Sequence, residues 1–392
     1  MTTPTIAGIG VRPRTVPVSG REPFAVGERM QGMVDRMRSA ATTPFVGVTR
    51  DGSIEPGLFP VAPSGVSTEP LRRAAGAFLD ALSDDQRAAV TLPLDSPEWR
   101  TWSNISPFLL RHGLLLEALD RPRRELALNV LRAASSRAGY ASARDVMKLN
   151  ETIAEITGRA NEYGEWLYWL SLFGAPSATE PWGWQIDGHH LIVNCLVLGD
   201  QLVLTPQFLG SEPVLAESGV YAGTRVFQVE EERGFALMRA LSDAQRDVAR
   251  VGMQLPGDVL GTAGQDNLVL DYAGLPASDL SGVQRELLLG LITTYVGRWP
   301  AGHDAVRLAE ISAHLDRTYF AWIGPCDDAR PFYYRVHSPV VLIEFDHLPG
   351  VALDNDAPTR NHIHTIVRTP NGNDYGKDLL RQHYATAAHH QR

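Results

Sequence analysis

The sequence predicts an α+β protein in which an N-terminal helical region packs on a mostly antiparallel sheet with additional helices. Three observations predict this class. Apolar residues recur at helical spacing between residues 68 and 180. Short runs of β-branched and aromatic residues, separated by turn signals, follow from residue 181. Helical segments interrupt these runs without the regular alternation that a parallel α/β sheet would show.

The chain has 392 residues and divides by composition into three regions. Residues 1–67 are rich in Pro, Gly, Thr and Val and predict an extended or irregular segment, with a short helix over 30–41. Residues 68–180 predict helices, and residues 181–385 predict an α+β region. We expect one compact unit, and no internal repeat is visible.

The helical region contains three clear amphipathic segments. These are Leu71–Leu82, Arg121–Ala138 and Ala141–Thr157, and residues 109–119 are apolar on most sides. Ser83 is a good N-cap for a further helix. Near the end of this region, Trp166, Trp169 and Phe173 follow the i, i+3, i+7 spacing that indicates one buried helix face.

Strand and hairpin signals dominate the last region. Gly199-Asp200 joins the runs 192–198 and 201–205 into a predicted hairpin. A second hairpin is predicted from 331–336 and 340–345, and another strand from 361–368. Helices are predicted from about 230 to 246, over 283–296 and over 303–319, and the glutamates at 230–232 suit the first turn of a helix.

The composition argues against several classes of protein. The formal net charge is −9 and there is no run rich in Lys or Arg, which argues against a nucleic-acid partner. No stretch of about 18 apolar residues predicts a membrane span. Cys195 and Cys326 are too few for a disulfide framework. No apolar leader follows a basic N-terminus, so we expect a cytoplasmic protein that acts on a small molecule, and the oligomeric state stays open.

Two histidine clusters, about 170 residues apart, are the candidate metal ligands. His362 and His364 are two apart on a predicted strand, so their side chains leave the same face. That geometry suits two nitrogen ligands of one metal ion. His189 and His190 follow Gly188 and would point to opposite faces of a strand. One of them can then supply a third ligand, unless a bulge at Gly188 brings both inward.

Charged residues near these strands are the candidate catalytic groups. Glu344 lies in an otherwise apolar strand, where it is a fourth ligand, a general base, or the partner of an arginine. Arg335 and Arg368 are candidates to bind an anionic group of the substrate. Asp187 is a candidate to orient a histidine. The proposed apolar wall of the pocket is formed by Trp182, Trp184 and Trp322.

The chain also resembles a bacterial and fungal family known only as domain of unknown function 3500. The resemblance runs from about Phe78 to His383. The motifs that carry it are Trp102-Ser103-Asn104-Ile105-Ser106-Pro107, Gly139-Tyr140, Phe173-Gly174-Ala175-Pro176-Ser177, Pro181-Trp182-Gly183-Trp184, Gly188-His189-His190, Thr205-Pro206-Gln207-Phe208-Leu209-Gly210, Phe320-Ala321-Trp322-Ile323-Gly324, Tyr333-Tyr334-Arg335, Ile343-Glu344, His362-Ile363-His364, Arg368 and Asn373-Asp374-Tyr375-Gly376. Similar chains tend to carry an aromatic residue where Val367 stands. The resemblance implies that the histidines, Glu344 and Arg368 form one motif set, and it implies no activity.

Together these features favour a metal-dependent enzyme, most readily an oxidoreductase or oxygenase acting on a small organic molecule. The cofactor would be a transition metal ion, Fe, Cu, Mn or Zn. Two alternatives stay open. One is a metal-independent hydrolase or lyase that uses a histidine as general base. The other is a small-molecule binding protein without catalytic activity.

Overall fold

The computed structural model describes residues 8–14, 18–22, 24, 26–105, 109–327 and 330–386. Within these residues, ten α-helices accompany a 13-stranded sheet whose strands are mostly antiparallel, which confirms the α+β class. The main order of strands is β1-β3-β4-β5-β7-β13-β12-β11-β10-β8, with β2, β6 and β9 attached to β3, β5 and β10. Among the described strands, the outer pairs β1–β3 and β8–β10 are parallel and the other pairs are antiparallel.

The strand bounds place both predicted hairpins and the histidine strand close to where the sequence indicates them. The strands are β1 (Thr91–Leu92), β2 (Leu114–Leu115), β3 (Tyr168–Phe173), β4 (Trp182–Gly188), β5 (Leu191–Leu198), β6 (Gln201–Val203), β7 (Gln207–Ser211), β8 (Arg250–Gly252), β9 (Leu275–Pro276), β10 (Tyr319–Ile323), β11 (Tyr333–His337), β12 (Leu342–His347) and β13 (Ile363–Arg368).

Half of the ten described helices begin at a serine or aspartate cap, and Ser83 is the cap that the sequence predicts. Ser83, Ser136, Ser242 and Ser281 each accept a hydrogen bond from a backbone N–H in the first turn of their helix. The helices are α1 (Glu28–Thr42), α2 (Glu69–Asp80), α3 (Asp84–Val90), α4 (Arg121–Ala133), α5 (Arg137–Thr157), α6 (Gln228–Ala240), α7 (Asp243–Ala249), α8 (Gly282–Val296), α9 (His303–Ala313) and α10 (Lys377–Thr386). None of the helices in the described part of the chain is long and apolar enough to cross a membrane.

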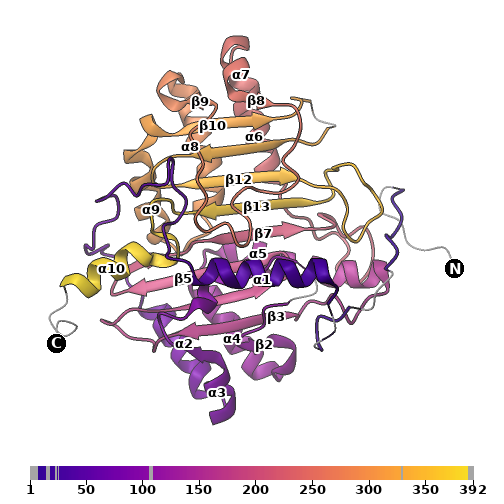
Figure 1. Ribbon diagram of the computed structural model, residues 1–392, viewed down its shortest axis with the longest axis vertical. Coiled ribbons are helices and arrows are strands. Elements are labelled where there is room, and N and C mark those ends of the chain that lie inside the picture. Colours follow the sequence, from indigo (N-terminus) through magenta and orange to yellow (C-terminus); the bar gives the residue numbers. More distant parts are fainter. Residues whose placement is uncertain are drawn as a thin grey trace.

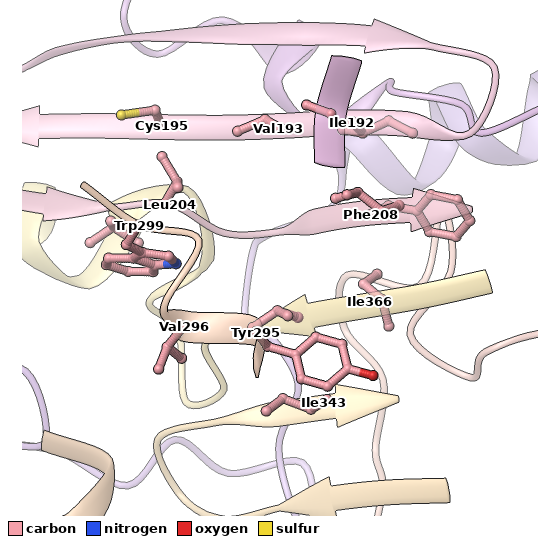
Figure 2. Close-up of a cluster of buried hydrophobic side chains, with 14 of the residues drawn as sticks. Ile192, Val193, Cys195, Leu204, Phe208, Tyr295, Val296, Trp299, Ile343 and Ile366 are labelled. Carbon is pink, nitrogen blue, oxygen red and sulfur yellow. The ribbon is translucent and has the colours of Figure 1, made fainter. Parts of the chain in front are cut away.

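The two faces of the sheet differ in chemistry. Helices α5, α6 and α8 lie behind the sheet in Figure 1, and the aromatic rings of Tyr334 and Trp322 meet Tyr295 of α8 and Phe235 of α6 there. Figure 2 shows part of the buried apolar cluster, including Tyr295. Helix α1 crosses in front, on the face that carries Glu344 and other polar side chains of β11, β12 and β13.

The sheet consists of two structurally equivalent halves, which corrects the expectation of no internal repeat. In Figure 1, strands of the first half of the chain form the lower part of the sheet and those of the second half form the upper part. The pairing registers match at a shift of 150 residues: Phe173 faces Gly183, and Ile323 faces Tyr333. The order of strands reads the same from both ends, with β7 and β13 adjacent at the centre.

The helices and loops repeat as well. Helices α2–α5 with β1 and β2 precede the first set of long strands, and α6–α9 with β8 and β9 precede the second. The segments 82–87 and 241–246 are identical at every position but the fourth, and both contain a capping box. Gly174 donates its N–H to Leu92, and Gly324 donates its N–H to Gly252 in the same way. The common sequence is limited to short stretches in caps and turns and to Arg124-Glu125-Leu126 of α4 and Arg285-Glu286-Leu287 of α8, so the repeat is faint in the sequence.

The prediction that Trp166, Trp169 and Phe173 lie on one helix was wrong. Trp169 and Phe173 belong to β3, and every residue of this strand is buried. The spacing misled because residues four apart share a face in a helix and also in a strand. Region 68–180 therefore supplies three strands, β1, β2 and β3, to the same sheet as the later strands. Residues 109–119 contain β2 and a short 3₁₀ turn, Leu116–Ala118, instead of a helix.

Candidate metal centre

Three histidines from the two predicted clusters meet at one point. One ring nitrogen from each of His190, His362 and His364 lies within 4.8 Å of the others. The three side chains are only 2–5% exposed. The group is therefore a buried set of three nitrogen donors that can hold a metal ion.

Strand β13 places two of the donors. His362 precedes the strand and His364 is its second residue, so both rings leave the same face, as the period of a strand requires. Their Nε2 atoms lie 3.1 Å apart, and the two rings are nearly perpendicular at 86°. Two nitrogens bound to one metal at about 2.0–2.1 Å would lie roughly this far apart.

The outer nitrogens of these rings are held by acceptors. Nδ1 of His362 donates to the carbonyl oxygen of Pro349 at 2.6 Å, and Nδ1 of His364 donates to Oδ1 of Asp258 at 2.7 Å. Because each Nδ1 donates to its acceptor, the two Nε2 atoms face each other directly. Two nitrogens in this position need a cation between them, either a proton shared as a hydrogen bond or a metal ion.

His190 completes the group from a tight turn. It is the second residue of the two-residue turn between β4 and β5 and has a positive φ of 64°. A side chain other than glycine is strained in this conformation, and such strain is concentrated at functional sites. The ring also needs Gly210 opposite it: a Cβ there would lie 2.9 Å from Cδ2 of His190 and 2.8 Å from Cδ2 of His364.

His189 leaves the turn in another direction. Its Nδ1 lies 2.8 Å from Oδ1 of Asn150 on α5, and its ring packs near Tyr163 while stacking on His190 at 3.8 Å between centroids. The structure thus resolves the open choice: His190 joins the strand pair, and His189 supports it from the side of α5.

Burial keeps the imidazoles of His189, His190 and His362 neutral. Burial, followed by the neighbouring histidines, lowers the pKa of His189 to about 3 and that of His190 well below its ordinary value. Burial likewise lowers the pKa of His362 to about 4. Metal ions bind the neutral form of imidazole, so the environment selects the ligating form.

Two carboxylates lie behind the histidines. Burial acts to raise the pKa of Asp258, but His364 and the donors Val259 and Thr262 outweigh it, and the net pKa is lowered. Glu212 lies 4.0 Å from Nδ1 of His362 and is held by three backbone N–H groups of residues 351–353. Asp258 and Glu212 thus place carboxyl groups beside two of the three histidines.

Glu344 does not join the three histidines in the described structure. It is fully buried and accepts hydrogen bonds from the N–H groups of Leu260 and Gly261 and from the hydroxyl of Tyr333, at 2.7–2.8 Å. Burial raises the pKa of Glu344 even though these donors act to lower it. The contacts of Glu344 hold the loop that carries Asp258 against the sheet.

The two candidate arginines are placed differently. Arg368 is completely buried and is bound by Asp266, Asp374 and the carbonyl oxygen of Gly261. These contacts bind the guanidinium of Arg368 to other groups of the protein. Arg335 donates from one terminal nitrogen to the carbonyl oxygen of Asp271, and its Nε has no partner among the described residues.

The three candidate tryptophans lie away from the histidines. Strand pairing places Trp184 opposite Cys195 and Trp322 opposite Tyr334, on the face covered by the helices. Trp322 stacks on Phe332 at 4.4 Å between centroids. Trp182 lies two residues before Trp184 on the same face and donates to the carbonyl oxygen of Ser177. The structure therefore makes these rings part of the core.

Sequence reasoning missed Asp258, Gly210 and Asp346. Asp346 pairs with His364 across the strands and is completely buried, and neither of its oxygens has a hydrogen-bond partner among the described residues. Burial, with Asp258 and Glu344 nearby, raises the pKa of Asp346 to about 9. An acidic residue in an apolar strand was a usable signal for Asp346, as it was for Glu344. Asp187, the expected partner of a histidine, instead accepts the N–H of Ser103.

Comparison with known proteins identifies the family. A family model described as "Protein of unknown function (DUF3500)" matches residues 64–377. The chain belongs to this family. The matched span contains His190, His362 and His364, together with Asp258 and Gly210. Ser106 and Pro107 of the first motif lie outside the described residues. Neither the curated proteins nor the solved structures contain a match to the chain.

Proposed function

We propose that the chain is a metal-dependent enzyme in which His190, His362 and His364 bind one transition-metal ion and a small organic molecule is the substrate. The observation that carries this proposal is the pair of Nε2 atoms 3.1 Å apart, with both Nδ1 atoms already donating elsewhere. A third imidazole nitrogen, from His190, lies within 4.8 Å of this pair, which favours a metal ion over a proton shared by two rings.

The ligand set supports a catalytic ion more than a structural one. Three protein ligands leave at least one coordination position for a substrate, whereas structural zinc sites use four protein ligands. The site can be approached past Asp258, whose side chain is 34% exposed while the histidines are buried. Imidazole suits Fe, Cu and Zn, and Mn stays a candidate with weaker preference.

Oxidation of the substrate is the reaction class that we favour. Neutral imidazole ligands add no negative charge to the centre, which stabilises the reduced state of iron or copper. Burial would also shield an oxidisable molecule from bulk water.

Elemental analysis tests the metal. We expect about one equivalent of transition metal per chain in protein purified without added metal, and its loss in His364→Gln and His190→Gln. His314→Gln, at the end of α9, is the matched control and should keep the metal. Less than about a tenth of an equivalent in the native protein, unchanged after reconstitution, would refute the proposal.

Metal exchange then tests the reaction class. Protein loaded with iron or copper should consume oxygen with some members of a panel of small organic acids and phenols, and protein loaded with zinc should not. Hydrolysis of esters by the zinc form alone would overturn the oxidation assignment while leaving the metal centre standing.

A further inference from the structure

The loop that follows β12 orients one of the three histidines. Its residues, 348–361, lead from β12 to His362. The carbonyl oxygen of Pro349 in this loop accepts the hydrogen of Nδ1 of His362 at 2.6 Å. Leu348 also donates its N–H to the carbonyl oxygen of His362 at 2.9 Å. The direction in which Nε2 of His362 points therefore depends on the conformation of this loop.

Glu212 holds the loop from the side of the sheet. Its carboxylate accepts hydrogen bonds from the backbone N–H groups of residues 351–353, at 2.9–3.2 Å. The side chain of Glu212 is only 2% exposed. Because Glu212 directly follows β7, these bonds anchor the loop to a central strand of the sheet.

The N-terminal segment 8–12 holds the same loop from the other side. The backbone N–H of Arg12 donates to the carbonyl oxygen of Ala352 at 2.9 Å. The backbone N–H of Asp354 donates in return to the carbonyl oxygen of Gly10 at 2.8 Å. Figure 1 shows the yellow loop beside the indigo N-terminal segment. Two segments from opposite ends of the chain are thus joined next to the metal centre.

The side chain of Arg12 adds three contacts to the loop. Its Nε donates to the carbonyl oxygen of Leu353 at 3.3 Å. Its terminal nitrogens lie 3.6 Å from Asp354 and 3.0 Å from Asp356. These three charged side chains are 34%, 54% and 94% exposed, in that order. Ion pairs as exposed as these are weak and are screened by salt.

The apolar contacts under this segment are separate from the main core. Ile9 and Val11 are partly buried and pack on a small cluster of its own, formed by Ile153, Ala154, Ile156, Tyr163, Ala352 and Leu353. A part of a protein with few apolar contacts opens locally at a lower cost than the core does. The segment can therefore detach while the sheet stays folded.

We propose that the segment 8–12 is a strap that retains the metal ion in the centre, and that Arg12 closes it. This inference rests on the metal centre proposed above. While the strap is in place, the loop is fixed on both sides and Nδ1 of His362 keeps its acceptor. When the strap detaches, Glu212 holds the loop from one side only, and His362 can turn away from the ion. Metal release is then faster, and it depends on salt because the ion pairs of Arg12 are screened.

The rate of metal release tests the strap. Protein loaded with zinc or cobalt is mixed with an excess of a chromophoric chelator, and the transfer of metal is followed. Arg12→Gln should release the ion about three- to tenfold faster than the native protein, and Asp356→Asn should show a smaller increase. Salt at about 0.5 M should speed release from the native protein and narrow its difference from Arg12→Gln.

Arg123→Gln is the matched control. Arg123 is 37% exposed, pairs with Asp120 and donates from Nε to the carbonyl oxygen of Ala81, so it loses the same kinds of contact at the start of α4. This variant should release metal like the native protein.

Hydrogen exchange measured by mass spectrometry reports on the loop without any metal. Arg12→Gln should exchange faster than the native protein over residues 349–355 and equally over residues 258–266. Equal exchange over 349–355, or faster exchange there with an unchanged rate of metal release, overturns the strap and leaves the metal centre standing. A native protein that binds no metal refutes the proposed function itself, and with it the strap, which then has no ion to retain.

Discussion

Asp258 is the residue on which the orientation of His364 depends. Its carboxylate holds Nδ1 of that ring at 2.7 Å and so turns Nε2 toward His362. Carboxylates in this position raise the basicity of the ligand and fix its tautomer. The loop supplies Asp258 from 106 residues away in the sequence.

We expect Asp258→Asn to weaken metal binding by about 10–100-fold without unfolding the protein. The amide can still accept a hydrogen bond through its oxygen, but it lacks the negative charge. Competition with a chelator of known affinity measures the effect. The exposed substitution Asp243→Asn is the control, and an unchanged affinity in Asp258→Asn would show that His364 is oriented by packing alone.

His337 makes stability sensitive to acid. Burial, followed by the nearby Arg335, lowers the pKa of His337 to about 3 from 6.5. Protonation therefore favours the unfolded chain. The stability contributed by the neutral ring is complete above pH 6.5 and is lost as the pH falls from 6.5 towards 3.

At pH 5 this loss amounts to about 2 kcal/mol, because each pKa unit between 6.5 and the working pH costs about 1.4 kcal/mol. Urea unfolding at pH 7 and pH 5 should therefore show that the native protein loses about this much more stability than His337→Gln. His314→Gln should lose as much as the native protein. Equal losses in all three proteins would contradict the role of His337.

At the scale of elements, the loop from Asp258 to Asp266 is the link between the sheet and the histidines. Glu344 anchors its beginning through two backbone N–H groups, and Arg368 anchors its end through Asp266. Gly261 passes so close that a Cβ there would lie 3.0 Å from Oε2 of Glu344. Glu344 of β12 and Arg368 of β13 therefore hold this loop in place.

Glu344→Ala tests this function of the loop. The change leaves two N–H groups and the hydroxyl of Tyr333 without their acceptor, at a cost of about 1–3 kcal/mol for each group that stays buried. Hydrogen exchange measured by mass spectrometry should rise over residues 258–266, and metal affinity should fall with it. Glu232→Ala, on the exposed side of α6, should change neither. Faster exchange with unchanged metal affinity would show that the order of this loop does not affect metal binding.

At the scale of the whole molecule, the two equivalent halves meet at β7 and β13. Two sterically constrained glycines occupy matching positions in the two halves. Gly113 and Gly274 both have a positive φ, of 78° and 93°. A Cβ would lie 2.3 Å from the carbonyl oxygen of Leu170 in one case and 2.2 Å from that of Phe320 in the other.

We expect Gly113→Ala and Gly274→Ala to destabilise the protein by similar amounts, about 2–4 kcal/mol each, because both introduce strain at positive φ and a backbone clash. Gly76→Ala is the matched control. Gly76 lies in α2 with no atom close to its Cβ position, and alanine there should stabilise by about 0.5–1 kcal/mol. Urea midpoints measure all three. A large effect at only one of the paired glycines would argue against equivalent halves.

The α+β class, the hairpins, the helix cap at Ser83 and the pairing of His362 with His364 could all be predicted from the sequence. Each depends on residues close together in the chain, where a period of two or 3.6 or a capping side chain determines the conformation. The same local signals fail where both periods fit, as they do for Trp169 and Phe173. They also give only a faint indication of a repeat whose two copies share caps, glycines and a few helix residues.

Only the tertiary structure decided the composition of the centre. The conformation of a turn places His190, and not His189, beside His362 and His364. A loop brings Asp258 to His364, and Gly210 lies opposite the rings of His190 and His364. The tertiary structure also bound Arg368 to Asp266 and Asp374, and it placed the three candidate tryptophans in the core. These outcomes depend on contacts between residues far apart in the chain, and packing determines such contacts, whereas sequence period determines only the face from which a side chain leaves.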